Sequence, residues 1–127
     1  MANSLPSGIP NVITLLRAKQ MTLRFRQNRE IILDERFRGR DVLPFSETIE
    51  KTSLQQLIDN PECTAIRIYF GMDEQLRVHP IIVGVNSRNE DIIDLTLPDT
   101  TETGELLNDG VRCPPVCPPP SPLNEPI

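Results

Sequence analysis

The chain has 127 residues and a formal net charge of −5, and 13 of its residues are prolines. This length is typical of one domain and is sufficient to bury a hydrophobic core. No segment approaches the roughly eighteen consecutive apolar residues that cross a bilayer, and the first residues lack the basic and apolar regions of a signal peptide. We therefore expect a cytoplasmic protein that does not associate with membranes.

The charge is distributed unevenly along the chain. Residues 1–60 carry nine Lys and Arg against seven Asp and Glu, whereas residues 61–127 carry four against eleven. Such asymmetry can guide the basic part of one copy onto the acidic part of another, and it is equally compatible with a solvated surface. The basic residues are concentrated over 17–40, but the acidic total and the scarcity of aromatic residues argue against nucleic-acid binding.

The first predicted element is an amphipathic helix over residues 15–29, preceded by a loosely structured start. Thr14 is a suitable N-cap because its hydroxyl can accept a hydrogen bond from the first helical turn. Ala18, Met21 and Phe25 recur at the spacing of one helix face, while most of the basic residues fall elsewhere on the helical wheel. The pattern therefore predicts a helix with an apolar face and a basic face.

A connector and a second helix follow. Residues 31–45 hold no regular period, so we expect a connector that contains a short helical turn. Thr52 begins the sequence T-S-L-Q, which places Gln55 at the third helical position of a capping box. This second helix is expected to end at Asn60, because Pro61 follows.

A change to alternating residues predicts a β-strand in the segment TAIRIYF. Ile66, Ile68 and Phe70 lie on one face of this strand, and Arg67 and Tyr69 lie on the other. A strand with one apolar face is typical of a sheet that is covered on that side. We therefore expect the isoleucines and the phenylalanine to face the core.

The next segments predict the rest of a sheet. A second strand is expected over 76–85, where Pro80 indicates an edge or an irregularity. A polar turn over 86–91 leads to Ile92, where a third strand can begin, and a short pairing segment is possible over 106–107.

The predicted fold is α+β, with two helices packed on an antiparallel meander of about three strands. We expect residues 1–110 to form a single domain and residues 111–127 to form an extended proline-rich tail.

Two cysteines stand among the prolines of the tail, in the sequence RCPPVCPPP. Proline favours the extended polyproline II conformation, which would separate Cys113 and Cys117 by roughly 12 Å. A disulfide requires the two Cα atoms to lie within about 7 Å. Only a cis proline or a tight turn at Pro114 and Pro115 would bring the sulfur atoms together. The cytoplasm also keeps thiols reduced, so we expect Cys63, Cys113 and Cys117 to be free thiols or ligands.

Three interpretations of the tail stay open. It can be a structural or docking segment in which Pro114, Pro115, Pro118, Pro119 and Pro120 make the contacts, because polyproline segments lose little entropy on binding. It can also be a redox pair formed by the two cysteines. The third interpretation is a zinc site, for which the candidate ligands are Cys113, Cys117, Cys63 and His79.

Enzymatic activity has weak support in the sequence. His79, Tyr69, Arg67 and Arg77 could form a polar cluster on the outer face of the sheet, where they could bind an anion or transfer a proton. A solvated sheet face with cross-strand polar pairs is the commoner arrangement. We find no phosphate-binding loop, dinucleotide-binding motif or metalloprotease motif, so no catalytic residue or cofactor is predicted.

Four segments together resemble a family of small, uncharacterised bacterial proteins. These segments are LPFSETI, CTAIRIYFGMDE, IIVGV and RCPPVCPPP, and the resemblance covers residues 13–123 in the same order. It implies a bacterial cytoplasmic protein and a Cys-Pro-Pro-x-Cys ending that belongs to the family, and it implies no activity. The sequence as a whole favours a non-enzymatic module that self-associates or docks on a partner. The alternative hypothesis is a thiol-based metal-binding or redox protein that uses Cys113 and Cys117.

Overall fold

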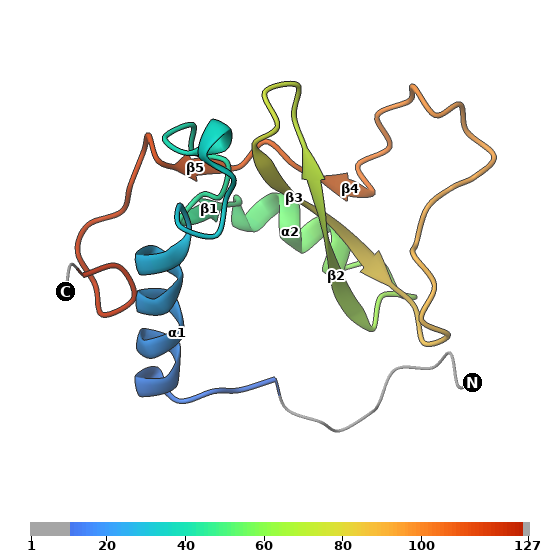
Figure 1. Cartoon of the computed structure of the whole chain (residues 1–127). Coiled ribbons are helices and arrows are strands. Elements are labelled where there is room, and N and C mark those ends of the chain that lie inside the picture. Colours follow the sequence, from blue (N-terminus) through green and yellow to red (C-terminus); the bar gives the residue numbers. More distant parts are fainter. Residues whose placement is uncertain (1–10, 126–127) are drawn as a thin grey trace. The chain divides into compact units, whose positions relative to one another are not determined.

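The computed structural model describes residues 11–125; the loose start expected for the first ten residues lies outside this range. The described chain is an α+β fold with two α-helices and antiparallel sheets (Figure 1). Its elements are α1 (Leu15–Asn28), the 3-10 helix η1 (Glu35–Phe37), β1 (Ser46–Thr48), α2 (Lys51–Ile58), β2 (Ala65–Met72), β3 (Val78–Val85), β4 (Leu106–Leu107) and β5 (Val111–Cys113).

These elements form two compact units that alternate along the chain. The hairpin unit consists of residues 48–71 and 79–110, and the helix–tail unit consists of residues 11–47, 72–78 and 111–125. The first contains α2 and most of the β2–β3 hairpin, and the second contains α1, β5 and the proline-rich segment. Residues 111–125 therefore group with residues 11–47.

Helix α1 forms where its cap was predicted. The Thr14 side chain accepts a hydrogen bond from the backbone N–H of Arg17 at 3.1 Å, and the N–H of Arg29 closes the last turn on the carbonyl of Phe25. The predicted apolar face is only partly covered, because Met21 and Phe25 are 49% and 38% exposed. The helix is thus confirmed, whereas the extent of its buried face was overestimated.

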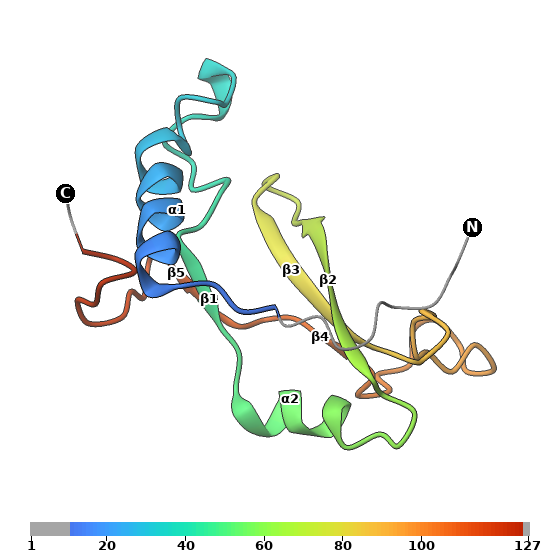
Figure 2. The same cartoon turned by 90° about the horizontal axis from the view of Figure 1, so that it is seen from below.

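Helix α2 lies on one side of the β2–β3 hairpin (Figures 1 and 2). It begins at Lys51, and its N-cap is Glu50, which makes no side-chain capping bond. The predicted capping box at Thr52 is therefore wrong, because Thr52 already lies inside the first turn. Leu57 is the buried residue of this helix, and it anchors α2 in the hairpin unit.

The core of the hairpin unit is the second half of β3. Val83 and Val85 are 0% and 1% exposed. The strand order is β2-β3-β4, so β3 is the central strand, and Ile82 and Val83 pair with Leu107 and Leu106 of β4. Burying such side chains is the main source of stability in a small unit.

The third strand of this sheet is β4, and the strand expected to begin at Ile92 is replaced by a single bridge. The turn over 86–91 closes through a bond from Asn86 N–H to the Glu90 carbonyl, and an isolated bridge joins Val85 to Asp91. Asp94 then bends the chain by accepting hydrogen bonds from Thr96. The backbone therefore leaves the sheet before a strand can form at Ile92.

One face of β2 differs from the sequence prediction. Ile66, Ile68 and Phe70 were expected in the core, but they are 37%, 53% and 81% exposed. Arg67 and Tyr69 share the opposite face, where both contact Asp91. The alternation correctly predicted which residues share a face, but it could not predict which face the rest of the chain covers, because coverage depends on tertiary packing.

Candidate functional site

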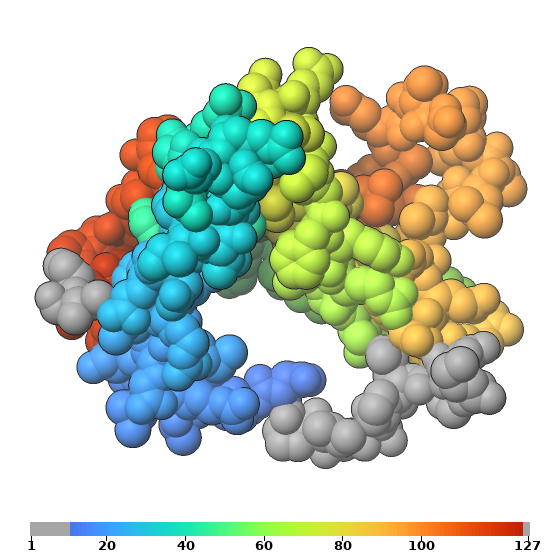
Figure 3. Space-filling view, in the orientation of Figure 1, coloured from blue at the N-terminus to red at the C-terminus, as the bar shows by residue number. Residues whose placement is uncertain are grey.

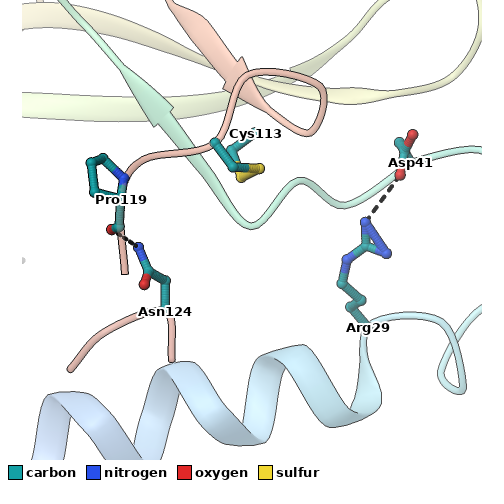
Figure 4. The surroundings of a disulfide bond; sticks show 6 residues. Arg29, Asp41, Cys113, Pro119 and Asn124 are labelled. Carbon is teal, nitrogen blue, oxygen red and sulfur yellow. Dashed lines mark hydrogen bonds and ion pairs between the residues drawn. A yellow bond between two sulfur atoms is a disulfide. The ribbon is translucent and has the colours of Figure 1, made fainter. Parts of the chain in front are cut away.

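The two cysteines of the tail form a disulfide (Figure 4). Their Cα atoms lie 4.6 Å apart, and the Cys113–Pro114 and Pro114–Pro115 peptide bonds are cis. The extended conformation that the prolines favour is therefore wrong for residues 113–117, as is the expectation that these two cysteines are free thiols. Cys113 is buried and Cys117 is exposed, while Cys63 is a free, half-buried thiol.

Beyond the disulfide, the tail folds back on α1. Asn124 donates a hydrogen bond to the carbonyl of Pro119 at 3.1 Å, which closes a turn over Ser121–Asn124 (Figure 4). The guanidinium of Arg26 donates to the carbonyls of Leu123 and Glu125 at 2.6 and 2.7 Å. The tail therefore uses its own helix as a docking partner, and docking on another protein through the prolines stays a prediction.

Arg112, immediately before the disulfide, is the central polar residue of the helix–tail unit. Its side chain comes from β5 and is only 9% exposed. The guanidinium donates hydrogen bonds to the backbone carbonyls of Val78, Asp41 and Val42. Burial, followed by the positive charge of Arg77, lowers the pKa of Arg112 from its ordinary value. The three carbonyls accept from the two terminal nitrogens of the guanidinium, whereas the buried Nε has no hydrogen-bond partner.

A second buried arginine stands at the end of α1. The guanidinium of Arg29 pairs with the carboxylates of Glu30 and Asp41, each at 3.1 Å, and lies 4.1 Å from the centroid of the Phe45 ring. Asp41 thus accepts Arg29 at its side chain and Arg112 at its backbone carbonyl. The two arginines hold the 41–45 segment between α1 and β5.

The polar face of β2 carries a compact ion-pair cluster. Arg67 donates to Asp91 and Asn89, and the hydroxyl of Tyr69 donates to the second carboxylate oxygen of Asp91. The hydrogen bond from Tyr69, followed by the one from Arg67, lowers the pKa of Asp91. The same bond to Asp91 raises the pKa of Tyr69. Strand β2 supplies the phenol and the guanidinium, and the turn after β3 supplies the carboxylate.

This cluster corresponds only in part to the predicted polar cluster around His79. The structure brings Arg67 and Tyr69 together, whereas Arg77 pairs with Asp73 at 2.9 Å within the helix–tail unit. Sequence reasoning missed Asp91 as the shared acceptor, because Asp91 is 24 residues from Arg67 and 22 residues from Tyr69 along the chain. Each polar group in the cluster already has a partner, so the arrangement is suited to holding the turn after β3 against β2.

The predicted zinc ligands do not form a metal site in the described chain. Cys113 and Cys117 are bonded to each other, and the Cys63 thiol lies 3.3 Å from the carbonyl of Ala65. Within residues 11–125 no three His, Cys, Asp or Glu side chains form a group that could hold a metal ion. In this disulfide form the tail cysteines have no thiolate to offer a metal.

A small cavity lies between α2 and the sheet of the hairpin unit. Its volume is about 30 Å³, enough for one or two water molecules. It is lined by Gln56, Leu57, Asn60, Gly84, Ile92 and Glu105. A cavity of this size is a packing defect rather than a substrate pocket.

The apolar face of β2, defined as Ile66, Ile68, Phe70 and Met72, is the most extensive exposed feature of the strand. Met72 is 63% exposed, and Phe70 is the most exposed of the four. Figure 3 shows the segment that contains β2, in light green, on the near surface of the molecule. Four large apolar side chains at alternating positions form a continuous stripe. Such a stripe is typical of contact surfaces.

The sequence matches no protein-family model, and neither a curated protein nor a solved structure matches the chain. The resemblance to small bacterial proteins therefore stays a prediction. No helix within residues 11–125 is long and apolar enough to cross a membrane.

Replacing Arg112 should destabilise the helix–tail unit. Arg112→Leu keeps the apolar stem and leaves the carbonyls of Val78 and Asp41 buried without their donor, which should cost about 3 kcal/mol of unfolding free energy. Urea denaturation followed by circular dichroism measures this loss. Arg36→Leu is the control and should leave the midpoint unchanged, because the Arg36 side chain is 75% exposed. A change of less than about 1 kcal/mol for Arg112→Leu would contradict the assigned role.

The Asp91 cluster should make stability depend on acid pH. Because folding lowers the pKa of Asp91 below its ordinary value of 3.8, the cluster stabilises the fold above that pH and loses its effect as the pH falls through the folded-state pKa. Asp91→Asn should therefore lower the urea midpoint at about pH 7 and have little effect at about pH 2. Asp99→Asn, in an exposed loop, is the control. An equal effect of Asp91→Asn at both pH values would show that ionisation is not involved.

Proposed function

We propose that this protein is a non-enzymatic interaction module that contacts another protein surface through the apolar face of β2. The observation that carries the proposal is the exposure of Ile66, Ile68 and Phe70 on a strand at the end of its sheet. Folded proteins rarely leave such a stripe in water, because covering it releases hydration water. A surface of this kind is typical of a protein–protein contact.

The hairpin unit supports this surface rigidly. Both faces of the second half of β3 are buried, and β3 pairs with β2 along the sheet. On the polar face of β2, Arg67 is neutralised by Asp91. The strand is therefore ordered before it meets a partner, and a preorganised surface binds with a smaller loss of conformational entropy.

The basic segment over 17–40 gives less support to a nucleic-acid partner. Arg26 and Arg29 bind groups of their own unit, and Arg38 donates to the backbone carbonyls of Glu30, Leu33 and Ile31. Arginines committed to internal acceptors cannot neutralise phosphates without losing those bonds. The partner that fits the structure is a protein surface with an apolar stripe of its own.

A photo-crosslinker at position 70 should test the proposed contact. If Phe70 is replaced by p-benzoylphenylalanine in cells that express the full chain, illumination should yield a crosslinked product of defined mass. The same replacement at Leu95, which is 88% exposed and lies outside the strands, is the matched control. Mass spectrometry then distinguishes a second copy from another protein. Equal crosslinking at positions 70 and 95, or no crosslinking at either position, would contradict the proposal.

The disulfide favours a second candidate function, in which the tail takes part in thiol–disulfide exchange. A dithiol reductant can attack the sulfur of the exposed Cys117, breaking the S–S bond and releasing Cys113 as a thiolate that takes up a proton. The second thiol of the reductant then frees Cys117, and the reductant becomes a disulfide, having supplied two electrons. Disulfides in the cytoplasm are usually transient and catalytic or redox-sensing, so a cytoplasmic location requires such cycling.

Alkylation of the folded chain measures this exchange. Without reductant, Cys63 is the one cysteine expected to react, because the other two are bonded to each other. After incubation with dithiothreitol under native conditions, mass spectrometry should show alkylation at Cys113 and Cys117 as well. A Cys113→Ser, Cys117→Ser variant should react only at Cys63 in both cases. If the two tail cysteines were alkylated only after unfolding, the disulfide would be shown to be purely structural.

A further inference from the structure

We infer that β2 pairs with β2 of a second copy of this chain, antiparallel and across a two-fold axis that passes through Ile68. This inference rests on the proposed function and names its partner. The second copy supplies a strand partner for the free edge of β2 and sets a second apolar stripe beside the first, since an isologous interface brings the same surface together twice.

The backbone of β2 is prepared for such pairing. Among residues 11–125, β2 pairs with β3 alone, so its other edge presents N–H and C=O groups without a strand partner. Sheet edges are usually protected by lysine, proline, bulges or short length. The eight residues AIRIYFGM of β2 include no lysine and no proline, and the charge of Arg67 is paired with Asp91. The edge therefore lacks the features that prevent strand addition.

Matching of the two faces limits the register. Opposite residues of an antiparallel pair point to the same face, so the apolar stripe meets itself only if the two-fold axis passes through a residue. An axis nearer either end of β2 leaves more of the strand unpaired; an axis through Arg67, for example, pairs only residues 65–69. Axes through Ile68 and Tyr69 pair residues 65–71 and 66–72, and they are the two registers that use most of the strand.

The pairing of Arg67 favours the axis through Ile68. In that register Arg67 lies opposite Tyr69 of the second copy, where an arginine can stack on the aromatic ring. On the apolar face, Ile66 lies opposite Phe70 of the second copy, a β-branched–aromatic pair that stabilises antiparallel strands. The axis through Tyr69 instead sets Arg67 opposite Gly71, which has no side chain to cover it. The Ile68 register thus gives both faces of β2 a partner.

Edge pairing brings the exposed apolar side chains of the two copies side by side. The four residues of the apolar face are between 37% and 81% exposed, which amounts to an apolar area on the order of 400 Å² per chain. A stable interface buries about 800 Å² per partner, of which somewhat more than half is apolar. The facing flanks of the stripe and the paired backbone contribute to such an interface, while the outward surface of the stripe stays exposed in the pair.

Sedimentation velocity on the purified full chain tests the association. We expect a dimer for the natural sequence and a monomer for Ile68→Lys, because the two-fold axis would place two lysines directly opposite each other. Leu95→Lys, which adds the same charge at a more exposed apolar residue, should remain a dimer. A monomeric natural chain would overturn the inference, and a crosslink from position 70 to a different protein would then still support the interaction function. A dimer that persists in Ile68→Lys would overturn the choice of β2.

Cysteine crosslinking tests the register without requiring the dimer to be broken. In a Cys63→Ser background, mild oxidation of Ile68→Cys should give a covalent dimer, since only a residue on the axis meets its own copy. Tyr69→Cys and the exposed Leu95→Cys should stay monomeric under denaturing electrophoresis. Crosslinking of Tyr69→Cys in place of Ile68→Cys would overturn the register, and crosslinking of neither would overturn the strand pairing.

Discussion

The buried guanidinium of Arg112 is the interaction on which the helix–tail unit depends. It donates hydrogen bonds to the carbonyls of Val78, Asp41 and Val42, which belong to segments more than thirty residues away along the chain. A buried cation is tolerated only where fixed dipoles replace its hydration, and backbone carbonyls provide them here. The carbonyl of Val42 also accepts a hydrogen bond from the N–H of Val78, so it binds both Arg112 and Val78. These polar contacts thereby join segments that also contribute the buried side chains of Val42 and Cys113.

The position of the tail follows from this arrangement. Cys113 is the residue after Arg112, and its carbonyl accepts the N–H of Phe45 in the small β1–β5 sheet. Once Cys113 is held there, the disulfide turn directs the chain toward α1, where Arg26 binds the carbonyls of Leu123 and Glu125. The prolines remove backbone donors, so side chains supply some of them: Arg26 donates to these two carbonyls and Asn124 donates to the carbonyl of Pro119. The C-terminal segment is therefore structural in the folded chain, whatever further contacts its prolines make.

In the hairpin unit, the polar face and the apolar face of β2 have different surroundings. The polar face of β2 is used internally, because Arg67 and Tyr69 bind Asp91 and hold the turn after β3. The apolar face is left exposed. Neutralising the charge on one face removes a barrier to strand pairing at the edge, so the internal ion pair and the proposed association support each other. The disulfide lies in the other unit, and the two candidate functions can be tested independently.

Local patterns in the sequence determined much of the secondary structure. The Thr14 cap, α1, the β2–β3 hairpin and the grouping of Arg67 with Tyr69 depend on residues close in sequence, and all four are present. The capping box of α2 failed although its motif is present, because motif spacing does not determine which residue begins the helix. Among the site residues, the tail cysteines were identified from sequence, but their bond was not, since proline statistics favour the extended chain.

Only the tertiary structure decided which surfaces are covered. Strand β4 is the short pairing segment expected over 106–107, but only the tertiary structure assigned β3 as its partner. Strand β5 has three residues, too few to show a period, and it exists because β1 offers it an edge. The burial of Arg112 and the exposure of Phe70 both reverse what their residue types favour. Arg112 is buried because distant segments contact it, and Phe70 is exposed because the rest of the described chain does not cover it. The sequence by itself determined the faces of β2, and the packing of the chain decided that the apolar one is exposed.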